Sequence, residues 1–329
     1  MPLTLPEVLL RRFRLTWARA TLGAAVVFLL LLAVVLLAEG ISLEEFYTSG
    51  IWRAALVSPT VVLYFMAIFP WTIRARLEEA QAFRPLVNLD DAGFQAMLEE
   101  DPTFRLRNAW LVTTLGFAFG AALRLLGLFP SSPWLNAYTI LTSGLMWASI
   151  SLGAYTGMAS PPVVTLAQKH GLRLDLFDLS FLQPVARNAL IVVLIFVGGI
   201  TVTLFYVPLQ ALLDPVNLIL YLGIAAITVW IFFQSMRGTH RAIVAEKQRE
   251  IVYVRRWMTS TYQRLQARAE DLDEVQQSTA QLRAWLALEQ RLLAVPEWPY
   301  DTRTLRSLFI SILVPIISVL ARVAMERLF

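Results

Sequence analysis

The chain has 329 residues, of which 57% are hydrophobic and only 16% are charged, and its formal net charge is +4. Because a soluble domain carries about 25% charged residues, this composition argues against a soluble globular protein. The absence of cysteine excludes disulfides, thiolate chemistry and cysteine-based metal sites. We attribute the positive net charge to arginines on the cytoplasmic side of a membrane, rather than to nucleic-acid binding.

Long uncharged stretches predict membrane spans. Charged side chains are absent from 20–38, 54–73, 125–168, 188–213 and 215–236. A helix needs about 20 apolar residues to cross a bilayer, so the third stretch is long enough for the end of one span and the whole of the next. We therefore expect an all-α, polytopic helical membrane protein with seven spans.

Residues 1–19 predict a basic amphipathic helix that lies on the membrane surface. Thr4 and Glu7 have the spacing of a capping box, and Pro6 suits the first turn of a helix. Arginines at positions 11, 12, 14 and 19 precede the apolar run 20–38. That run is too long for the core of a signal peptide and no convincing cleavage site follows it, so we expect it to be retained as the first span.

Residues 20–236 form a predicted six-span bundle, with spans at about 20–38, 54–73, 108–129, 135–157, 188–210 and 216–236. The third span carries Gly116 and Gly120, and the fourth carries Gly153 and Gly157. Glycines four residues apart let neighbouring helices approach closely.

Residues 297–329 form a predicted linker and seventh span. The apolar stretch 307–321 has only 15 residues. It can cross the bilayer only if Arg322 and Arg327 extend their charged groups to the far interface.

The distribution of basic residues predicts the orientation. The N-terminus and the loops after even-numbered spans hold nearly all of the lysines and arginines, whereas the opposite loops hold Arg53 and none in 130–134 or 211–215. The positive-inside rule then places the N-terminus in the cytoplasm. With seven spans the C-terminus lies outside the plasma (inner) membrane.

Residues 237–296 predict a long cytoplasmic antiparallel helical hairpin between spans six and seven. No glycine or proline lies between Gly238 and Pro296, which favours helix. A single helix of this length would reach about 85 Å, but the ten residues 297–306 span at most about 35 Å. The chain must therefore fold back, and Asp271 marks the expected reversal.

Two heptad-like stripes are expected to form the seam of this hairpin. The outgoing stripe consists of Val244, Ile251, Val254, Met258, Tyr262 and Leu265, and the returning stripe of Leu272, Val275, Leu282, Leu286 and Leu293. The outgoing limb is mostly basic and the returning limb mostly acidic, which favours antiparallel pairing, although each exposed ion pair contributes less than about 1 kcal/mol.

No catalytic motif is recognisable. The sequence lacks a phosphate-binding loop, a zinc-protease helix, a nucleophile elbow and a dinucleotide-binding fingerprint. The two histidines, His170 and His240, lie in different segments. Four aspartates offer paired acids but more often act as helix caps or solvated side chains: Asp90, Asp91, Asp175 and Asp178. We therefore expect no enzyme, no cofactor and no metal site.

One polar stripe follows the last span at gaps of three or four residues. We expect its members to be candidates for lining a pore: Ser307, Ser311, Pro315, Ser318, Arg322 and Glu326, together with Arg124 in the third span. The alternative is that the small hydroxyl side chains pack against neighbouring helices, and that Arg124 extends to the interface or pairs with Glu326.

The segment Pro296-Glu-Trp-Pro-Tyr-Asp-Thr-Arg-Thr304 resembles the corresponding segment of uncharacterised bacterial membrane proteins that have a similar hairpin. This resemblance covers about 250–329 and implies no known activity. In topology alone, the plan is similar to the insect odorant and gustatory receptor channels. Those proteins have seven spans, an inside N-terminus, a cytoplasmic anchor of extended helices, and a final span that lines a tetrameric pore.

Three functions remain open on the sequence. The leading hypothesis is a homo-oligomeric channel or pore, with the last span near the axis and the hairpin as assembly domain. The runner-up is a non-transporting membrane scaffold or sensor that docks a cytoplasmic protein through 237–296. A small-molecule carrier comes third, because the predicted spans contain no acidic residue that would couple transport to protons. The expected partners are the lipid bilayer, further copies of the chain and a cytoplasmic protein, with no nucleic acid.

Overall fold

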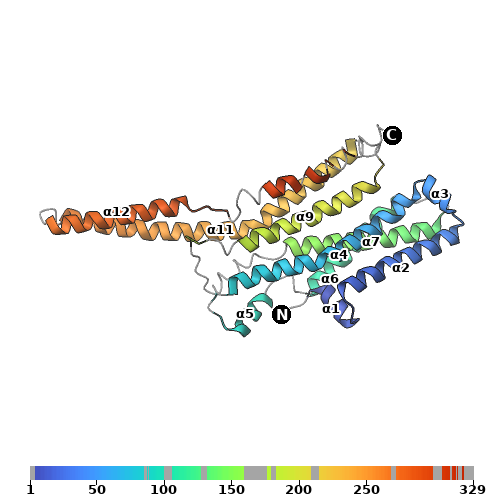
Figure 1. The fold of residues 1–329 in the computed structure, drawn as a ribbon, viewed down its shortest axis with the longest axis horizontal. Helices are drawn as coiled ribbons and strands as arrows, with labels where there is room; N and C mark the ends of the chain where they lie inside the picture. Colours follow the sequence, from blue (N-terminus) through green and yellow to red (C-terminus); the bar gives the residue numbers. More distant parts are fainter. Residues whose placement is uncertain are drawn as a thin grey trace.

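The computed structural model describes residues 4–84, 87, 89–99, 106–126, 132–158, 176–178, 183–208, 215–267, 272–298, 306–311, 313–315, 317 and 321. Within these ranges the regular structure is helical and contains no strand (Figure 1). The helices are α1 (Leu5–Arg12), α2 (Trp17–Glu39), α3 (Leu43–Thr48), α4 (Ile51–Phe83), α5 (Asp91–Glu99), α6 (Leu106–Leu125), α7 (Pro133–Met158), α9 (Gln183–Tyr206), α11 (Pro215–Ala267) and α12 (Leu272–Ala294). A further apolar helix, here called the last helix, runs over Arg306–Pro315. The predicted all-α class is confirmed for these residues.

The long helices run side by side as a bundle, and α11 extends far beyond it (Figure 1). Helix α3 lies at one end of the bundle, which we call the α3 end. Helices α1 and α5 lie toward the opposite end, which we call the α1 end. The C-terminal half of α11 projects past the α1 end and is accompanied there by α12.

Among the described residues, three helices have the length and apolar composition needed to cross a membrane: α2, α4 and α9. Helix α2 carries the most exposed apolar surface, with Leu22 67% and Leu37 82% accessible. Such a surface is unfavourable in water and favourable in lipid, so the chain is consistent with a membrane protein. The fourth predicted span, 135–157, falls within α7, and the third, 108–129, begins in α6, which ends at Leu125.

Helix α11 is continuous over 53 residues, a length of about 80 Å. It therefore passes without a break through the predicted boundary between the six-span bundle and the segment 237–296. Gly238 lies inside the helix, because one glycine costs only about 1 kcal/mol there and its neighbours Met236 and Thr239 are fully buried.

Glycines allow α6 and α7 to lie in close contact. A Cβ atom on Gly120 would lie 2.5 Å from the carbonyl oxygen of Ser143 in α7, and one on Gly116 would lie 2.7 Å from that of Trp147. The hydroxyl of Ser143 donates to the Gly120 carbonyl at 2.9 Å. The close approach expected for the Gly116 and Gly120 pair is thus confirmed.

Polar contacts fix α4 against α9. The Tyr64 hydroxyl donates to the carbonyl of Ile195 at 3.0 Å, and the hydroxyls of Thr60 and Tyr206 lie 2.7 Å apart. Gly198 leaves room for the Tyr64 ring, because a side chain at this position would overlap its hydroxyl. In an apolar environment such hydrogen bonds are satisfied within the protein, as the bilayer offers no partner.

The α3 end is closed by Glu39, the last residue of α2. Its carboxylate accepts hydrogen bonds from the backbone N–H groups of Trp134 at 2.6 Å and Leu135 at 3.2 Å. These groups belong to the first turn of α7, where N–H groups lack helical partners and favour negative charge. Glu39 therefore caps a helix that begins about 95 positions later in the chain.

The glycine contact gives a stability prediction. Gly120→Ala should destabilise the bundle by about 1–3 kcal/mol, because the added methyl group meets backbone atoms of α7 that cannot move alone. The matched control is Gly23→Ala in α2, where no atom lies within 4 Å of the added carbon. Thermal unfolding of both variants in detergent measures the difference; equal melting temperatures would contradict the close contact.

Candidate functional site

In the described part of the last helix, one member of the predicted polar stripe, Ser311, is buried against the bundle. Ser311 is 4% exposed, and its hydroxyl donates to the carbonyl of Leu308 at 2.7 Å. Leu308 belongs to a buried cluster with side chains of α9 and α11: Ala186, Ala189, Val193, Val197, Phe232 and Met236. By contrast, Phe309 and Ile310 are 68% and 54% exposed. Within one chain this arrangement agrees with the packing alternative.

The other pore-lining candidates are dispersed or lie beyond the described residues. Ser307 and Pro315 are partly buried in the last helix. Arg124 is partly buried near the end of α6, which packs against α7 and α1. Three candidates lie outside the described residues: Ser318, Arg322 and Glu326. A pore-lining role for this set stays a prediction.

Two of the four aspartates, Asp90 and Asp91, make structural contacts, and Asp175 lies outside the described residues. Asp90 accepts a hydrogen bond from the Gly93 N–H at 2.8 Å, as a helix cap does. Asp91 pairs with Arg84 at 2.7 Å on the surface. Among the described residues, no three histidine, aspartate or glutamate side chains lie close enough together to hold a metal ion.

Helix α12 runs back along the C-terminal half of α11, and we call residues 238–267 together with α12 the stalk. Near its middle, Arg255 pairs with Glu289 at 2.7 Å, and the rings of Trp257 and Trp285 stack 6.2 Å apart at 13°. Nearer the bundle, Lys247 of α11 contacts the carbonyl of Leu293 in α12. Residues farther along α11 thus meet residues earlier in α12, so the two helices are antiparallel.

The seam of the stalk differs from the predicted stripes. Ile251 and Val254 are buried as expected, but Tyr262 is 52% exposed. In α12 the predicted residues Leu272, Leu286 and Leu293 are 83%, 46% and 53% exposed. The side chains that pack from α12 into the core are instead Trp285, Leu288 and Leu292. The prediction for α12 was wrong for these three residues, whereas Val275 and Leu282 are partly buried. The leucines of α12 allow two apolar faces, and only contact with the bundle selects one.

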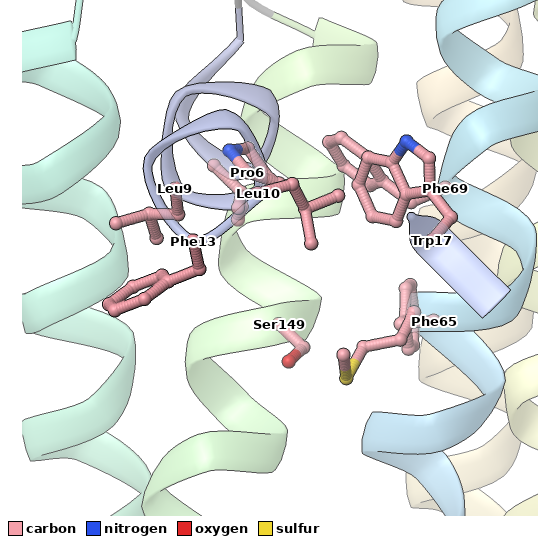
Figure 2. A pocket seen from close by; sticks show the side chains of 10 residues that line it. Pro6, Leu9, Leu10, Phe13, Trp17, Phe65, Phe69 and Ser149 are labelled. Carbon is pink, nitrogen blue, oxygen red and sulfur yellow. The ribbon is translucent and has the colours of Figure 1, made fainter. Parts of the chain in front are cut away.

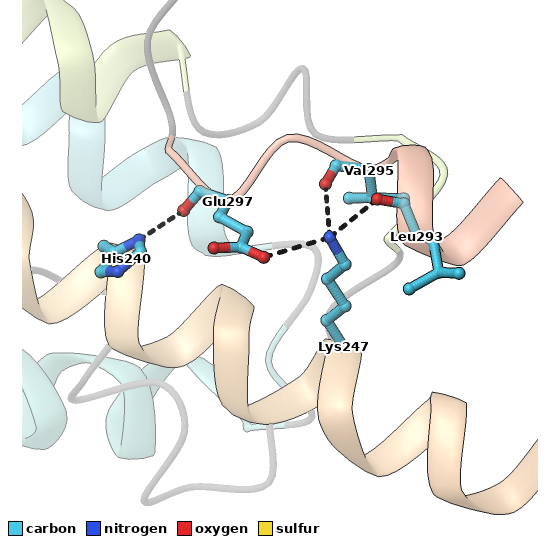
Figure 3. Close-up of polar contacts among 5 residues, drawn as sticks. All are labelled: His240, Lys247, Leu293, Val295 and Glu297. Atoms are coloured by element: carbon cyan, nitrogen blue, oxygen red, sulfur yellow. Dashed lines mark hydrogen bonds and ion pairs between the residues drawn. The ribbon is translucent and has the colours of Figure 1, made fainter. Parts of the chain in front are cut away.

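A buried lysine fixes the base of the stalk (Figure 3). The ammonium group of Lys247 donates to the carbonyls of Leu293 at 3.0 Å and Val295 at 2.9 Å, and to the Glu297 carboxylate at 3.2 Å. Its side chain is 8% exposed. Since an ammonium group has three donors, all are used. The two carbonyls lie at the C-terminus of α12, where a cation is favourable.

His240 provides a second attachment, about two helical turns closer to the bundle than Lys247. Its Nδ1 lies 2.8 Å from the Glu297 carbonyl oxygen, and because a carbonyl can only accept, Nδ1 carries the proton. The ring stacks on Trp298 at 4.1 Å and 10°. The chain leaving α12 is thus held against α11 at both ends of the segment 293–298.

A buried carboxylate, that of Glu79, joins α4 to α9. Glu79 is 1% exposed and receives two hydrogen bonds from Nη1 of Arg76, at 3.0 and 3.1 Å. The side-chain amide of Asn188 in α9 donates to it at 2.6 Å. Burial of the Glu79 carboxylate was not predicted, because α4 continues to Phe83, ten residues beyond the predicted span 54–73. Arg76 and Glu79 stand at helical spacing, which is the signal that pointed to the pair.

An aromatic patch lies on the stalk surface, formed by Tyr253, Trp257 and Trp285. Tyr253 is 52% exposed and Trp257 is 42% exposed, and their rings lie 6.2 Å apart. The stalk projects beyond the bundle (Figure 1), so these rings lie away from the apolar helix surfaces. Tyrosine and tryptophan are the side chains most enriched at the centres of protein interfaces. The patch is therefore the surface of the stalk best suited to bind another protein.

The role of Lys247 is testable by substitution. Lys247→Met keeps the apolar stem but removes three donors, leaving buried carbonyls at the end of α12 without a partner. We expect the free energy of local opening of α12 to fall by about 1–3 kcal/mol. Hydrogen exchange of the α12 amides measures this change, and amides of α4 should be unaffected.

The control for this substitution is Arg249→Met two positions away. Arg249 is 79% exposed and forms only a 3.6 Å surface pair with Glu246, so its loss should change exchange little. If the two variants exchange alike in α12, the lysine does not hold the base of the stalk.

The chain was compared with protein-family models, curated proteins and solved structures, and none of the three comparisons returned a match.

Proposed function

We propose that this protein is a non-transporting membrane scaffold or sensor, which docks a cytoplasmic protein through the aromatic patch of the stalk. In this proposal the chain crosses the plasma membrane seven times, and the stalk is a cytoplasmic helical hairpin. The observation that carries the proposal is the aromatic patch, with exposed Tyr253 and Trp257 beside the partly buried Trp285, on a stalk that is continuous with a helix of the bundle.

Charge distribution supports the orientation. Basic side chains gather toward the α1 end, where α4 ends, α9 begins and the stalk departs; they include Arg74, Arg76, Arg187, Arg237 and Arg241. Among the described residues at the α3 end, the basic side chains are Arg53 and Arg124, beside the acidic Glu39, Glu44 and Glu45. Basic residues favour the cytoplasmic side, so the α1 end and the stalk face the cytoplasm.

Rigidity of the stalk also supports docking. Lys247 and His240 hold the chain after α12 to α11, and the Arg255–Glu289 pair links the helices farther out. A surface that is already ordered loses little conformational entropy on binding, which favours affinity. The exposed rings would then supply most of the contact area.

Site-specific photo-crosslinking tests the proposal. A photoreactive residue at Tyr253 in the full chain, expressed in its native cells, should yield one discrete adduct with a second protein. The control position is Thr259, which is exposed and lies 200° around the helix from Trp257, on the opposite side of α11. The docking proposal is wrong if no adduct forms at Tyr253, or if Tyr253 and Thr259 give equal amounts of adduct.

When Trp257→Ala is added to the chain that carries the photoreactive residue at position 253, the amount of adduct should fall at least tenfold. The reason is that loss of a central aromatic contact weakens the binding free energy by about 2 kcal/mol or more. Val252→Ala is the matched control, because Val252 is 53% exposed on the other side of α11. Intact chain in the membrane fraction should be equal for both variants; a Trp257→Ala adduct as strong as that of Val252→Ala would contradict the role of the patch.

A homo-oligomeric channel is the second candidate. The observation that favours it is the exposed apolar face of the last helix at Phe309 and Ile310, which is available to another copy of the chain. In that case the stalk adduct would contain two copies, and light scattering in mild detergent would give a multiple of the 37.1 kDa chain mass.

Thiol accessibility separates the two candidates. In the scaffold, Ser311→Cys should not react with a charged thiol reagent in intact membranes, because this side chain is 4% exposed within the chain. The parent has no cysteine, so a new exposed cysteine at Thr259 provides a clean positive control. Fast labelling at position 311 would place it on a water-filled path and favour the channel.

A further inference from the structure

An apolar cavity lies between α1 and the bundle (Figure 2). Its volume is about 220 Å³. Two walls face each other across it, and the side chains that form them include Leu9, Leu10 and Phe13 of α1, Phe65 and Phe69 of α4, and Leu152 of α7. Helix α1 therefore rests on the bundle, with Leu5 only 4% exposed.

The cavity suits a hydrocarbon chain. The polar side-chain groups in its lining are the indole N–H of Trp17 and the hydroxyl of Ser149, and this hydroxyl already donates to the carbonyl of Leu145 at 2.9 Å. A dry apolar cavity of about 150 Å³ is large enough to bind benzene, so this volume accommodates a longer segment of hydrocarbon. At the rim, Phe13 is 67% exposed and Leu9 is 37% exposed, which extends the apolar surface outward.

Four arginines lie close in sequence to residues that line the cavity: Arg11, Arg12, Arg14 and Arg19. Each lies within two residues of a lining side chain, namely Leu10, Phe13 or Trp17. All four are exposed, and none forms an ion pair with the described residues. Trp17 begins α2, a helix able to cross the membrane, so the cavity and these cations lie where the apolar layer meets water.

The backbone at Arg14 shows that a cation occupies a position where glycine is usual. Its φ is 53°, and it terminates α1 in the left-handed conformation, with Leu15 N–H bonded to the Leu10 carbonyl and Arg14 N–H to that of Arg11. Glycine adopts this conformation without strain. Arg14→Gly therefore removes the charge without endangering the fold.

We propose that the cavity binds one acyl chain of an anionic phospholipid of the cytoplasmic leaflet, whose headgroup contacts the arginines of 11–19. The apolar walls of the cavity bind the acyl chain, and the arginines bind the phosphate of the headgroup. Recognition therefore needs both parts of one lipid molecule. The bound lipid fills the space under α1 and fastens it to α4 and α7. This site is separate from the stalk and does not depend on the docking proposal.

The test is lipid retention by the full chain in mild detergent, measured by native mass spectrometry. Phosphatidylglycerol and phosphatidylcholine with identical acyl chains are the two probes. One phosphatidylglycerol per chain should be retained at lower lipid concentration than phosphatidylcholine. Equal retention of the two lipids, or no retained lipid, would overturn the proposal.

Two variants separate the acyl and headgroup parts. Leu152→Trp fills the cavity and should abolish retention of both lipids. Arg14→Gly should weaken phosphatidylglycerol binding about fivefold, the effect of roughly one cation at a membrane surface, and leave phosphatidylcholine unchanged. Arg256→Gln on the exposed stalk is the charge control. If Leu152→Trp does not fold, Arg14→Gly decides alone; retention unchanged in Arg14→Gly means that the lipid binds elsewhere and the proposal is wrong.

Discussion

The stalk is held to the bundle by buried side chains that meet where α4, α9, α11 and α12 come together. Phe83 at the end of α4, Ile243 and Val254 in α11, and Leu292 in α12 are all at most 2% exposed. A large apolar group of this kind contributes about 1.5–3 kcal/mol when fully buried. The direction of α11 outside the bundle, the position of α12 and the surface available to a partner all depend on this cluster.

Polar groups make this junction specific rather than merely stable. Glu79 requires both Arg76 and Asn188, and Lys247 requires the carbonyls that end α12. Removing one partner from such a buried set costs far more than the set contributes as a whole. Apolar side chains alone would tolerate several positions of α12 on α11, whereas the bonds from Lys247 fix the C-terminus of α12 at one place. The aromatic patch therefore points in a defined direction.

The sequence predicts the helical class well, because uncharged stretches and glycine spacing reflect local rules. Gly116 and Gly120 lie in contact with α7 as their spacing indicates. The failures concern relations between distant segments. The leucines of α12 permit two apolar faces, so Leu286 and Leu293 were assigned to the seam although they are exposed. Glu79 has an ordinary helical neighbour in Arg76, and its burial depends on α9, more than 100 residues away. No local pattern reports such a contact.

The continuity of α11 also has a mechanical consequence. An unbroken helix bends little over its length, whereas a loop at residue 237 would absorb any movement of the bundle. From Gly238 to Ala267 the helix reaches about 45 Å. A tilt of about 5° at the junction therefore displaces the far end of the stalk by roughly 4 Å, close to the spacing of two packed atoms. The helix works as a lever arm, and a change in bilayer thickness or in the packing of α9 would be magnified at its tip.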